Sequence, residues 1–175
     1  MKLHIRNRYP LLLAIVLVVV GLDQWTKYWI VKNLAGHQTI TVLDRFFHIV
    51  HVHNSGAAFG MLSDWAYGSY FLTGVSILAI VGIILYFFAV PVISPLTKIS
   101  LAMILGGALG NLIDRLRYGY VVDFVDWHID DYHWPAFNIA DSSISVAVAL
   151  LVLDLILDLK RSSGNAGNPN ASHTV

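Results

Sequence analysis

Four long runs of apolar residues dominate the hydropathy pattern of this chain. They cover residues 10–31, 68–90, 96–113 and 139–159. A helix needs about 20 apolar residues to cross the hydrocarbon core of a bilayer, and each run comes close to that length. Two prolines, Pro91 and Pro95, separate the second run from the third. The pattern therefore predicts a mainly α-helical membrane protein with four transmembrane helices.

The first apolar run also has the shape of a signal peptide, because basic residues precede it near the amino-terminus. Two observations favour an uncleaved span. The helical pattern continues through Trp25 and Trp29, and no small-x-small cleavage site follows closely. Aromatic residues at the end of such a run are typical of the boundary between membrane and water. We therefore expect the first run to remain in the protein as a span.

The segment between the first two runs, residues 36–61, follows a different pattern. Residues 39–42 and 46–52 are rich in β-branched and aromatic side chains that partly alternate with polar ones, which predicts short strands. The segment is too polar to span a membrane and too apolar for a solvated linker. We expect it to form a small β-sheet at the membrane surface.

Two other segments lack a transmembrane pattern. Residues 115–135 are rich in Asp, Trp and Tyr and predict a second loop on the side of the sheet, whereas residues 162–175 predict a disordered tail. The density of Lys and Arg next to the spans favours cytoplasmic termini, which makes the sheet and the second loop extracytoplasmic. We expect residues 1–161 to form a single integral membrane domain.

The composition narrows the possible functions. Hydrophobic residues make up 57% of the chain and charged residues 13%, against about 25% charged in soluble domains. The formal net charge is zero and no basic cluster is present, which argues against nucleic acid as a partner. All eleven acidic residues are Asp, and Cys is absent. Disulfides, thiolate metal sites and a Cys nucleophile are therefore excluded.

Unusual polar residues recur at the ends of the predicted spans and in the two connections. They are Asp23, Lys27, Asn54, Asn111, Asp114, Arg115, Asp123, Asn138 and Asp141. Counting spans along the chain places every one of them on the same side of the membrane, whichever way the protein is oriented. Ionisable residues beside a span are candidates for a functional site. We therefore predict one site at the membrane–water boundary.

A pair of carboxyl groups at such a site suggests hydrolysis by acid–base chemistry. Like charges held close together cannot both ionise easily, so the pair retains one proton near neutral pH. The ionised member can take a proton from water, and the protonated member can donate to the carbonyl oxygen or the leaving amine. Donors such as Asn54 or Arg115 could hold a developing oxyanion.

Five short motifs at these positions resemble those of the lipoprotein signal peptidase family, also called signal peptidase II. They are Asp23-Gln24-x-Thr26-Lys27, the run from Asn54 to Gly60, the Gly-Asn-Leu-Ile-Asp-Arg run at 110–115, Val122-Asp123-Phe124, and Phe137-Asn138-Ile139-Ala140-Asp141. Each motif alone is a weak signal. Their order and spacing on a four-span chain make the resemblance specific, and it extends from Asp23 to about Leu159.

The resemblance implies an aspartic endopeptidase of the bacterial cytoplasmic (inner) membrane. Such an enzyme removes signal peptides from prolipoproteins by cutting before the diacylglyceryl-modified cysteine of the lipobox. The family's catalytic pair falls on Asp123 and Asp141 of this chain. The implied partners are modified prolipoproteins, membrane lipid and cyclic peptide inhibitors similar to globomycin. We expect a monomer that uses no cofactor.

The remaining motif positions are expected to support the site or to contact the substrate. They are Asp23, Lys27, Asn54, Gly56, Asn111, Asp114, Arg115, Asn138 and Ala140.

Purely structural roles are open for several of these residues. Asp141 could be the N-cap of the last helix, and Asp123 a surface carboxylate paired with Arg117. Asp114 and Arg115 could form an ion pair where the third span ends. Asp23 and Lys27 have the spacing of an ordinary pair on one helix, and Asn54 could hold a turn with Gly56.

Three histidines, His48, His51 and His53, raise the possibility of a metallopeptidase. The chain has no His-Glu-x-x-His motif, no Glu and no Cys, so we favour interfacial histidines in an aromatic loop and expect no metal. A second alternative is a small non-enzymatic protein such as a proton or ion transporter subunit. A transport path would spread its acids through the depth of the membrane, whereas here they gather at one surface.

Overall fold

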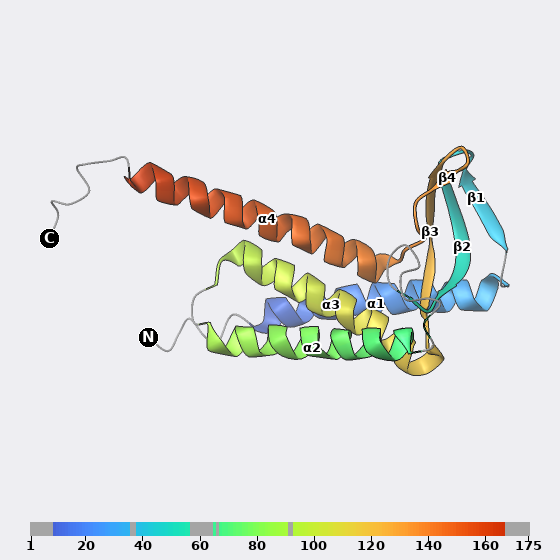
Figure 1. The fold of residues 1–175 in the computed structure, drawn as a ribbon, viewed down its shortest axis with the longest axis horizontal. Helices are drawn as coiled ribbons and strands as arrows, with labels where there is room; N and C mark the ends of the chain where they lie inside the picture. Colours follow the sequence, from blue (N-terminus) through green and yellow to red (C-terminus); the bar gives the residue numbers. More distant parts are fainter. Residues whose placement is uncertain (1–8, 36–37, 57–64, 66, 91–92, 167–175) are drawn as a thin grey trace, which may run out of the picture.

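Four helices and a four-stranded sheet make up the fold of this computed structural model, which describes residues 9–35, 38–56, 65, 67–90 and 93–166. The elements in chain order are α1 (Tyr9–Asn33), β1 (Thr39–Leu43), β2 (Phe47–Asn54), α2 (Gly68–Ala89), α3 (Pro95–Tyr118), β3 (Val121–Ile129), β4 (Tyr132–His133) and α4 (Ile139–Ala166). All four helices are long and apolar enough to cross a membrane, which confirms the predicted fold class. The sheet lies at one end of the helices (Figure 1).

Two helices extend beyond the ends expected from the apolar runs. α3 continues from residue 113 to Tyr118 and ends at Gly119, whose φ of 80° is the left-handed conformation that favours glycine at a helix carboxyl end. α4 continues from residue 159 to Ala166, so the first residues of the expected tail are helical. The rest of that tail, residues 167–175, lies outside the described residues.

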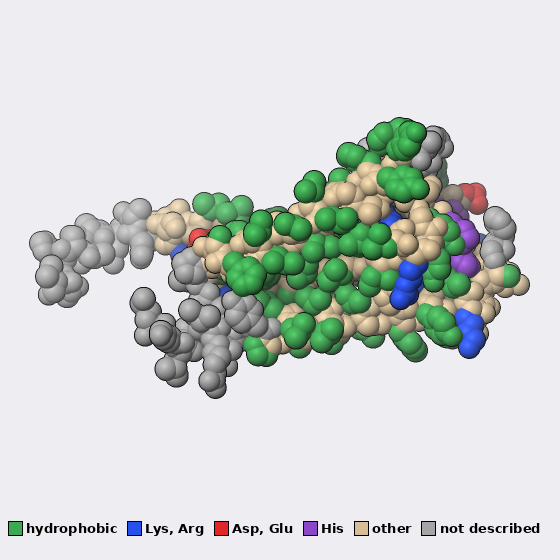
Figure 2. All heavy atoms as spheres, turned by 90° about the horizontal axis from the view of Figure 1, so that it is seen from below, with side chains coloured by type: hydrophobic (Ala, Val, Ile, Leu, Met, Phe, Trp, Pro, Cys, Tyr) green, Lys and Arg blue, Asp and Glu red, His purple; other side chains and the backbone are tan. Residues whose placement is uncertain are grey.

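Apolar side chains cover the outside of the helices, as expected for a protein whose solvent is lipid (Figure 2). α2 is the clearest case. Leu78 and Phe88 are 73% and 72% exposed, and Gly68 is the one buried residue recorded for this helix in the described chain. Most of the polar residues that the sequence singled out are instead buried, chiefly between α1, α3, α4 and β3, whereas Asn54, Arg115 and Asp141 are partly exposed.

Glycines on α3 allow two other helices to approach its backbone. A Cβ on Gly106 would lie 2.8 Å from Cβ of Val19 in α1, and one on Gly107 would lie 2.6 Å from the carbonyl oxygen of Ala140 in α4. At Gly110 a Cβ would lie 2.5 Å from Oδ2 of Asp23. The spacing of Gly106 and Gly110 predicts close helix packing, and these contacts confirm it.

The sheet has the order β1-β2-β3-β4 with antiparallel pairs throughout. The β1–β2 hairpin matches the strands expected from residues 39–42 and 46–52. β3 corrects the expectation that residues 115–135 form only a loop. Its first four residues, Val121 to Phe124, are all buried, so the alternation that reveals a strand with one wet face is missing.

β3 is the strand through which the sheet packs against the helices. Val122 and Phe124 form a buried apolar cluster with Ile30 and Leu34 at the end of α1. Past β4 the chain returns to β3, where the backbone of Phe137 exchanges hydrogen bonds with Val125. α4 begins two residues later, so its amino-terminal end lies beside β3.

A buried ion network ties the helices together at the end nearest the sheet. The ammonium group of Lys27 lies 2.9 Å from Oδ2 of Asp23 and 2.9 Å from Oδ2 of Asp114, and the three side chains are at most 3% exposed. The pairing of Asp23 with Lys27 on one helix is thus confirmed. The alternative in which Asp114 pairs with Arg115 is wrong, because Asp114 pairs with Lys27.

The two carboxylates of this network also bind backbone groups of other elements. Oδ1 of Asp23 accepts a hydrogen bond from the amide of Ala140 (2.9 Å), and Oδ2 of Asp114 accepts one from the amide of Val122 (3.1 Å). Gln24 donates to Oδ1 of Asp114 at 2.8 Å. The network therefore fixes the starts of α4 and β3 relative to α1 and α3.

We predict that Gly107→Ala destabilises the protein by about 1–3 kcal/mol, because the added methyl group meets the backbone of α4 rather than a movable side chain. Thermal unfolding in detergent measures the change. Gly82→Ala is the matched control: a Cβ there meets nothing within 4 Å, and alanine favours a helix. Equal unfolding temperatures for the two variants would contradict the packing role.

We predict that Lys27→Met lowers the free energy of unfolding by about 3–5 kcal/mol, because two buried carboxylates lose their shared cation. The same unfolding measurement applies. Lys32→Met, which removes an exposed lysine from the same helix, is expected to leave stability nearly unchanged. A Lys27→Met protein as stable as the Lys32→Met protein would show that the network contributes little.

Candidate active site

The start of α4 positions the first candidate carboxylate, Asp141. Asn138 precedes the helix, and its Oδ1 accepts a hydrogen bond from the amide of Asp141 at 2.9 Å. Oδ2 of Asp141 accepts one in return from the amide of Asn138 at 3.3 Å. This reciprocal pair is a capping box in which Asn138 is the N-cap. The alternative in which Asp141 is the N-cap is therefore wrong: Asp141 is the third residue of the helix.

The second candidate, Asp123, lies on β3 and is held by two amide side chains. Asn138 donates to its Oδ1 at 2.7 Å, and Asn54 at the end of β2 donates to its Oδ2 at 2.8 Å. Asp123 is 1% exposed, which rules out the alternative of a surface carboxylate paired with Arg117. Asn138 thus contacts both candidate carboxylates.

Asn54 combines the role in a turn with a contact to the site. Its Oδ1 accepts a hydrogen bond from the amide of Gly56 at 3.0 Å, as expected for a turn, and this leaves its amide nitrogen to donate to Asp123. The later part of the same motif, from Ala57 to Gly60, lies outside the described residues.

Asn111 on α3 connects the candidate pair to the ion network. Its Nδ2 donates to Oδ1 of Asp141 at 2.8 Å. Its Oδ1 accepts hydrogen bonds from Nζ of Lys27 at 3.0 Å and from Nδ2 of Asn138 at 3.2 Å. The lysine thereby orients the amide so that its donor side faces the carboxylate.

The surroundings of Asp123 favour its protonated form. Burial, and next the nearby charge of Asp141, raise the pKa of Asp123 to about 7, although the hydrogen bonds from Asn54 and Asn138 act in the opposite direction. A carboxyl group with such a pKa exchanges its proton near neutral pH. The arrangement can therefore place one acid and one base side by side.

A cavity of about 760 Å³ opens beside Asp141. Five of the residues predicted from the sequence line it, namely Asn54, Gly56, Asn111, Arg115 and Asp141. Within the described part of the chain, Nε of Arg115 is buried without a hydrogen-bond partner. The other predicted residues are not among the lining residues and lie behind them; these are Asp23, Lys27, Asp114, Asp123, Asn138 and Ala140.

The wall of the cavity also contains apolar residues that the sequence did not single out. They are Val121, Trp127, Trp134, Pro135, Ala136, Ile144 and Val146, which lie beside Phe137 of the last motif. The available signal was the abundance of Trp and Tyr in a connection between spans. That signal does not say which of the aromatic residues face the site, because their direction depends on β3.

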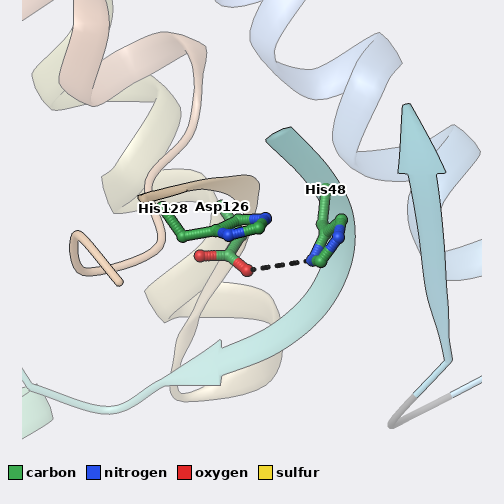
Figure 3. A group of neighbouring side chains, drawn as sticks. All are labelled: His48, Asp126 and His128. Carbon is green, nitrogen blue, oxygen red and sulfur yellow. Dashed lines mark ion pairs between the residues drawn. The ribbon is translucent and has the colours of Figure 1, made fainter. Parts of the chain in front are cut away.

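The three histidines of β2 do not form one cluster. His51 and His53 lie together, with their Nε2 atoms 3.2 Å apart. His48 lies instead beside Asp126 and His128 of β3 (Figure 3). The pairing of β2 with β3 changes register between Ile49 and Val52, which separates the two groups.

Known proteins match this chain over most of its length. The family model of Signal peptidase (SPase) II matches residues 15–157. The lipoprotein signal peptidase of Alteromonas mediterranea is 40% identical over 161 residues, which cover 88% of each chain. That of Moorella thermoacetica is 45% identical over 145 residues, which cover 83% of this chain and 92% of the relative.

A solved bacterial membrane enzyme at 2.3 Å resolution has a similar fold, with a TM-score of 0.78, 29% identity, and coverage of 95% of this chain and 96% of the other. A second bacterial membrane enzyme, at 1.9 Å resolution, has a TM-score of 0.74 and 33% identity, and the match covers 84% of this chain and 93% of that one. From its family match and its close relatives, the chain belongs to the signal peptidase II family.

Proposed function

We propose that Asp123 and Asp141 are the catalytic carboxyl pair of this enzyme. As a member of its family, the chain is an aspartic-type peptidase that removes signal peptides from prolipoproteins. The observation that carries the assignment of residues is the pair of hydrogen bonds that Asn138 donates, from its side-chain Nδ2 to Oδ1 of Asp123 and from its backbone amide to Oδ2 of Asp141, which lines the cavity. The family match does not favour the transporter alternative.

In this proposal Asp123 holds the shared proton and Asp141 is ionised. Asp141 lines the cavity and would take a proton from water as its oxygen attacks the scissile carbonyl carbon. Asp123 would protonate the carbonyl oxygen. Collapse of the tetrahedral intermediate breaks the C–N bond. The proton on Asp141 passes to the leaving amine, and a hydroxyl proton of the intermediate returns to Asp123 as the new carboxyl group forms. The pair begins and ends with one proton, so no metal or cofactor is needed.

Arg115 and Asn54 are the donors that we assign to the substrate. Both line the cavity, and the buried Nε of Arg115 has no hydrogen-bond partner among the described residues. A buried cationic donor without a partner is costly unless a ligand supplies an acceptor. A backbone carbonyl of the bound signal peptide, or the oxyanion that forms from it, would be that acceptor.

The apolar wall suits a substrate that carries a lipid. We propose that the enzyme cuts before the diacylglyceryl-modified cysteine of the lipobox while the acyl chains remain in the bilayer. The loop at Trp134–Ala136 would close over the peptide as a lid, and the β1–β2 hairpin would cradle it. Cross-linkers placed at Trp134 and at Val52 should capture a bound precursor; no capture from either position would contradict these roles.

The remaining parts of the proposal concern the cell and the inhibitor. We place the enzyme in the bacterial inner membrane as a monomer, with cytoplasmic termini and the site near the periplasmic surface. Cyclic peptides similar to globomycin would occupy the same cavity, because a ring of apolar residues can contact its wall while a polar group faces Asp141. Competition between such a peptide and the precursor tests that placement.

We predict that Asp123→Asn and Asp141→Asn each reduce cleavage of a diacylglyceryl-modified prolipoprotein by at least about 10³-fold, because an amide neither donates nor accepts the required proton. Purified protein in detergent with a chelator present provides the assay. Asp131→Asn, which changes an exposed aspartate, is the matched control and should cleave at the parental rate. Cleavage by both folded site variants would refute the assignment.

We predict that cleavage falls as pH rises above about 7, the pKa of Asp123, because the pair then loses the proton that acts as the acid. About half of the Asp123 groups keep the proton at pH 7, about a tenth at pH 8 and about a hundredth at pH 9, so the rate should fall roughly fivefold between pH 7 and pH 8 and roughly tenfold between pH 8 and pH 9. Initial rates measured across this range, with helix content recorded at each pH, give the profile. A rate that stays level or increases up to pH 9 would assign the proton elsewhere.

A further inference from the structure

The sheet brings four ionisable side chains onto one of its faces, away from the catalytic pair. In the register of the strands, His48 of β2 lies opposite Asp126 of β3, and His128 of β3 lies opposite His133 of β4. Asp126 and His128 are two residues apart and therefore point to the same face. Trp127 between them lines the catalytic cavity, so this group occupies the other face of β3.

Three of these side chains are arranged like the ligands of a metal ion. One donor atom from each of His48, Asp126 and His128 lies within 4.8 Å of the other two, and Nδ1 of His48 is 3.7 Å from Oδ2 of Asp126. Figure 3 shows the three side chains gathered between β2 and β3. Donors around a tetrahedral Zn²⁺ are about 3.4 Å apart, so small side-chain rotations would close the group around an ion.

His128 supplies an independent sign of a ligand. It is 7% exposed, and its Nε2 is buried with no hydrogen-bond partner in the described residues. Its Nδ1 lies 3.1 Å from the carbonyl oxygen of Asp130 and so must carry the ring proton, which leaves a lone pair on Nε2. A histidine that donates one ring N–H to a carbonyl and keeps the other nitrogen for the ion is typical of metal sites.

His133 supports the same arrangement from β4. Its Nδ1 lies 2.9 Å from Oδ1 of Asp126 and 3.0 Å from Oδ2, and its ring stacks on that of His128 at 4.7 Å. A bond to Oδ1 would hold the carboxylate while Oδ2 turns toward an ion. Asp126 is the single carboxylate among these four side chains.

We propose that His48, Asp126 and His128 form a binding site for a divalent transition-metal ion, with Zn²⁺ as the expected occupant. Two imidazole nitrogens and one carboxylate oxygen suit Zn²⁺, and water would complete a tetrahedron on the half-exposed side near His133. The ion is structural in this proposal, because it lies on the face of β3 opposite the catalytic cavity.

The position of the site gives the ion a definite effect. It would join β2 to β3, and through His133 it would hold the segment whose next three residues, Trp134 to Ala136, line the catalytic cavity. A bound metal would thus steady one wall of that cavity without entering the reaction. This inference does not depend on the assignment of the catalytic pair, since its test measures binding and not cleavage.

The test uses the full chain in detergent micelles, with any affinity tag removed and the metal stripped by a chelator that is then dialysed away. Calorimetric titration with Zn²⁺ should give one ion per chain with a dissociation constant in the micromolar range or below. Co²⁺ should give the visible absorption bands of a tetrahedral site. The unfolding temperature should rise by about 3 °C or more with saturating Zn²⁺.

His48→Ala and Asp126→Asn should each weaken Zn²⁺ binding at least tenfold, as should His128→Gln if its unfolding temperature shows that it is folded. His53→Ala removes another histidine from β2 and is the matched control, with unchanged binding expected. Two results would overturn the proposal. One is no binding by the parent at about 0.1 mM Zn²⁺; the other is loss of binding in His53→Ala with binding retained in His48→Ala, which would place the ion at the His51–His53 pair.

Discussion

The burial of one ammonium group between two carboxylates is the constraint on which the rest of this structure depends. Lys27 lies 2.9 Å from both Asp23 and Asp114, and none of the three side chains is more than 3% exposed. Lipid offers such groups no alternative partner, so the elements that supply them must meet in one arrangement. The glycines of α3 belong to the same constraint, because a side chain at Gly110 would occupy the space of the Asp23 carboxylate.

Amide side chains carry this constraint to the proposed catalytic pair. The side chain of Asn has an oxygen that accepts hydrogen bonds and an NH₂ group that donates them. An ion bound to the oxygen therefore fixes the direction in which the NH₂ group points. Lys27 donates a hydrogen bond to Oδ1 of Asn111, so the NH₂ group of Asn111 faces Asp141 and donates to it. In the same way, the backbone amide of Asp141 donates to Oδ1 of Asn138, and the NH₂ group of Asn138 then donates to Asp123. Asn54 and Asn138 hold Asp123 with neutral donors, and its pKa stays raised, at about 7, because burial and the charge of Asp141 outweigh these hydrogen bonds and the charge of Lys27.

The sequence alone was sufficient for those features that depend on local pattern or on counting. Apolar runs predicted the four spans, and their number placed the polar residues at one end. The sequence did not predict which residues from distant elements pair with the buried groups. The spacing of Asp23 and Lys27 predicts their pairing, but nothing in the local sequence indicates Asp114 as the second partner. β3 escaped prediction because its first residues are buried on both faces. The N-x-x-D pattern at Asn138 fits a cap at either residue, and only the path of the chain along β3 decides between them. The roles of Asp123 and Asp141 rest on resemblance and geometry together and stay a proposal.

β3 contributes side chains to two separate sites, the catalytic cavity on one face and the histidine group on the other. Successive side chains of a strand point to opposite faces, so Asp123 and Trp127, four residues apart, share the face of the catalytic cavity. Asp126 and His128 fall on the other face with the histidines of β2 and β4. A shift of β3 by one residue would exchange the two sets and move Asp123 away from Asn138. Contacts that hold Asp126 and His128 on the far face therefore also fix the register of β3, and with it the position of Asp123. This is the physical reason that charged and aromatic groups on the face away from the reaction can affect it.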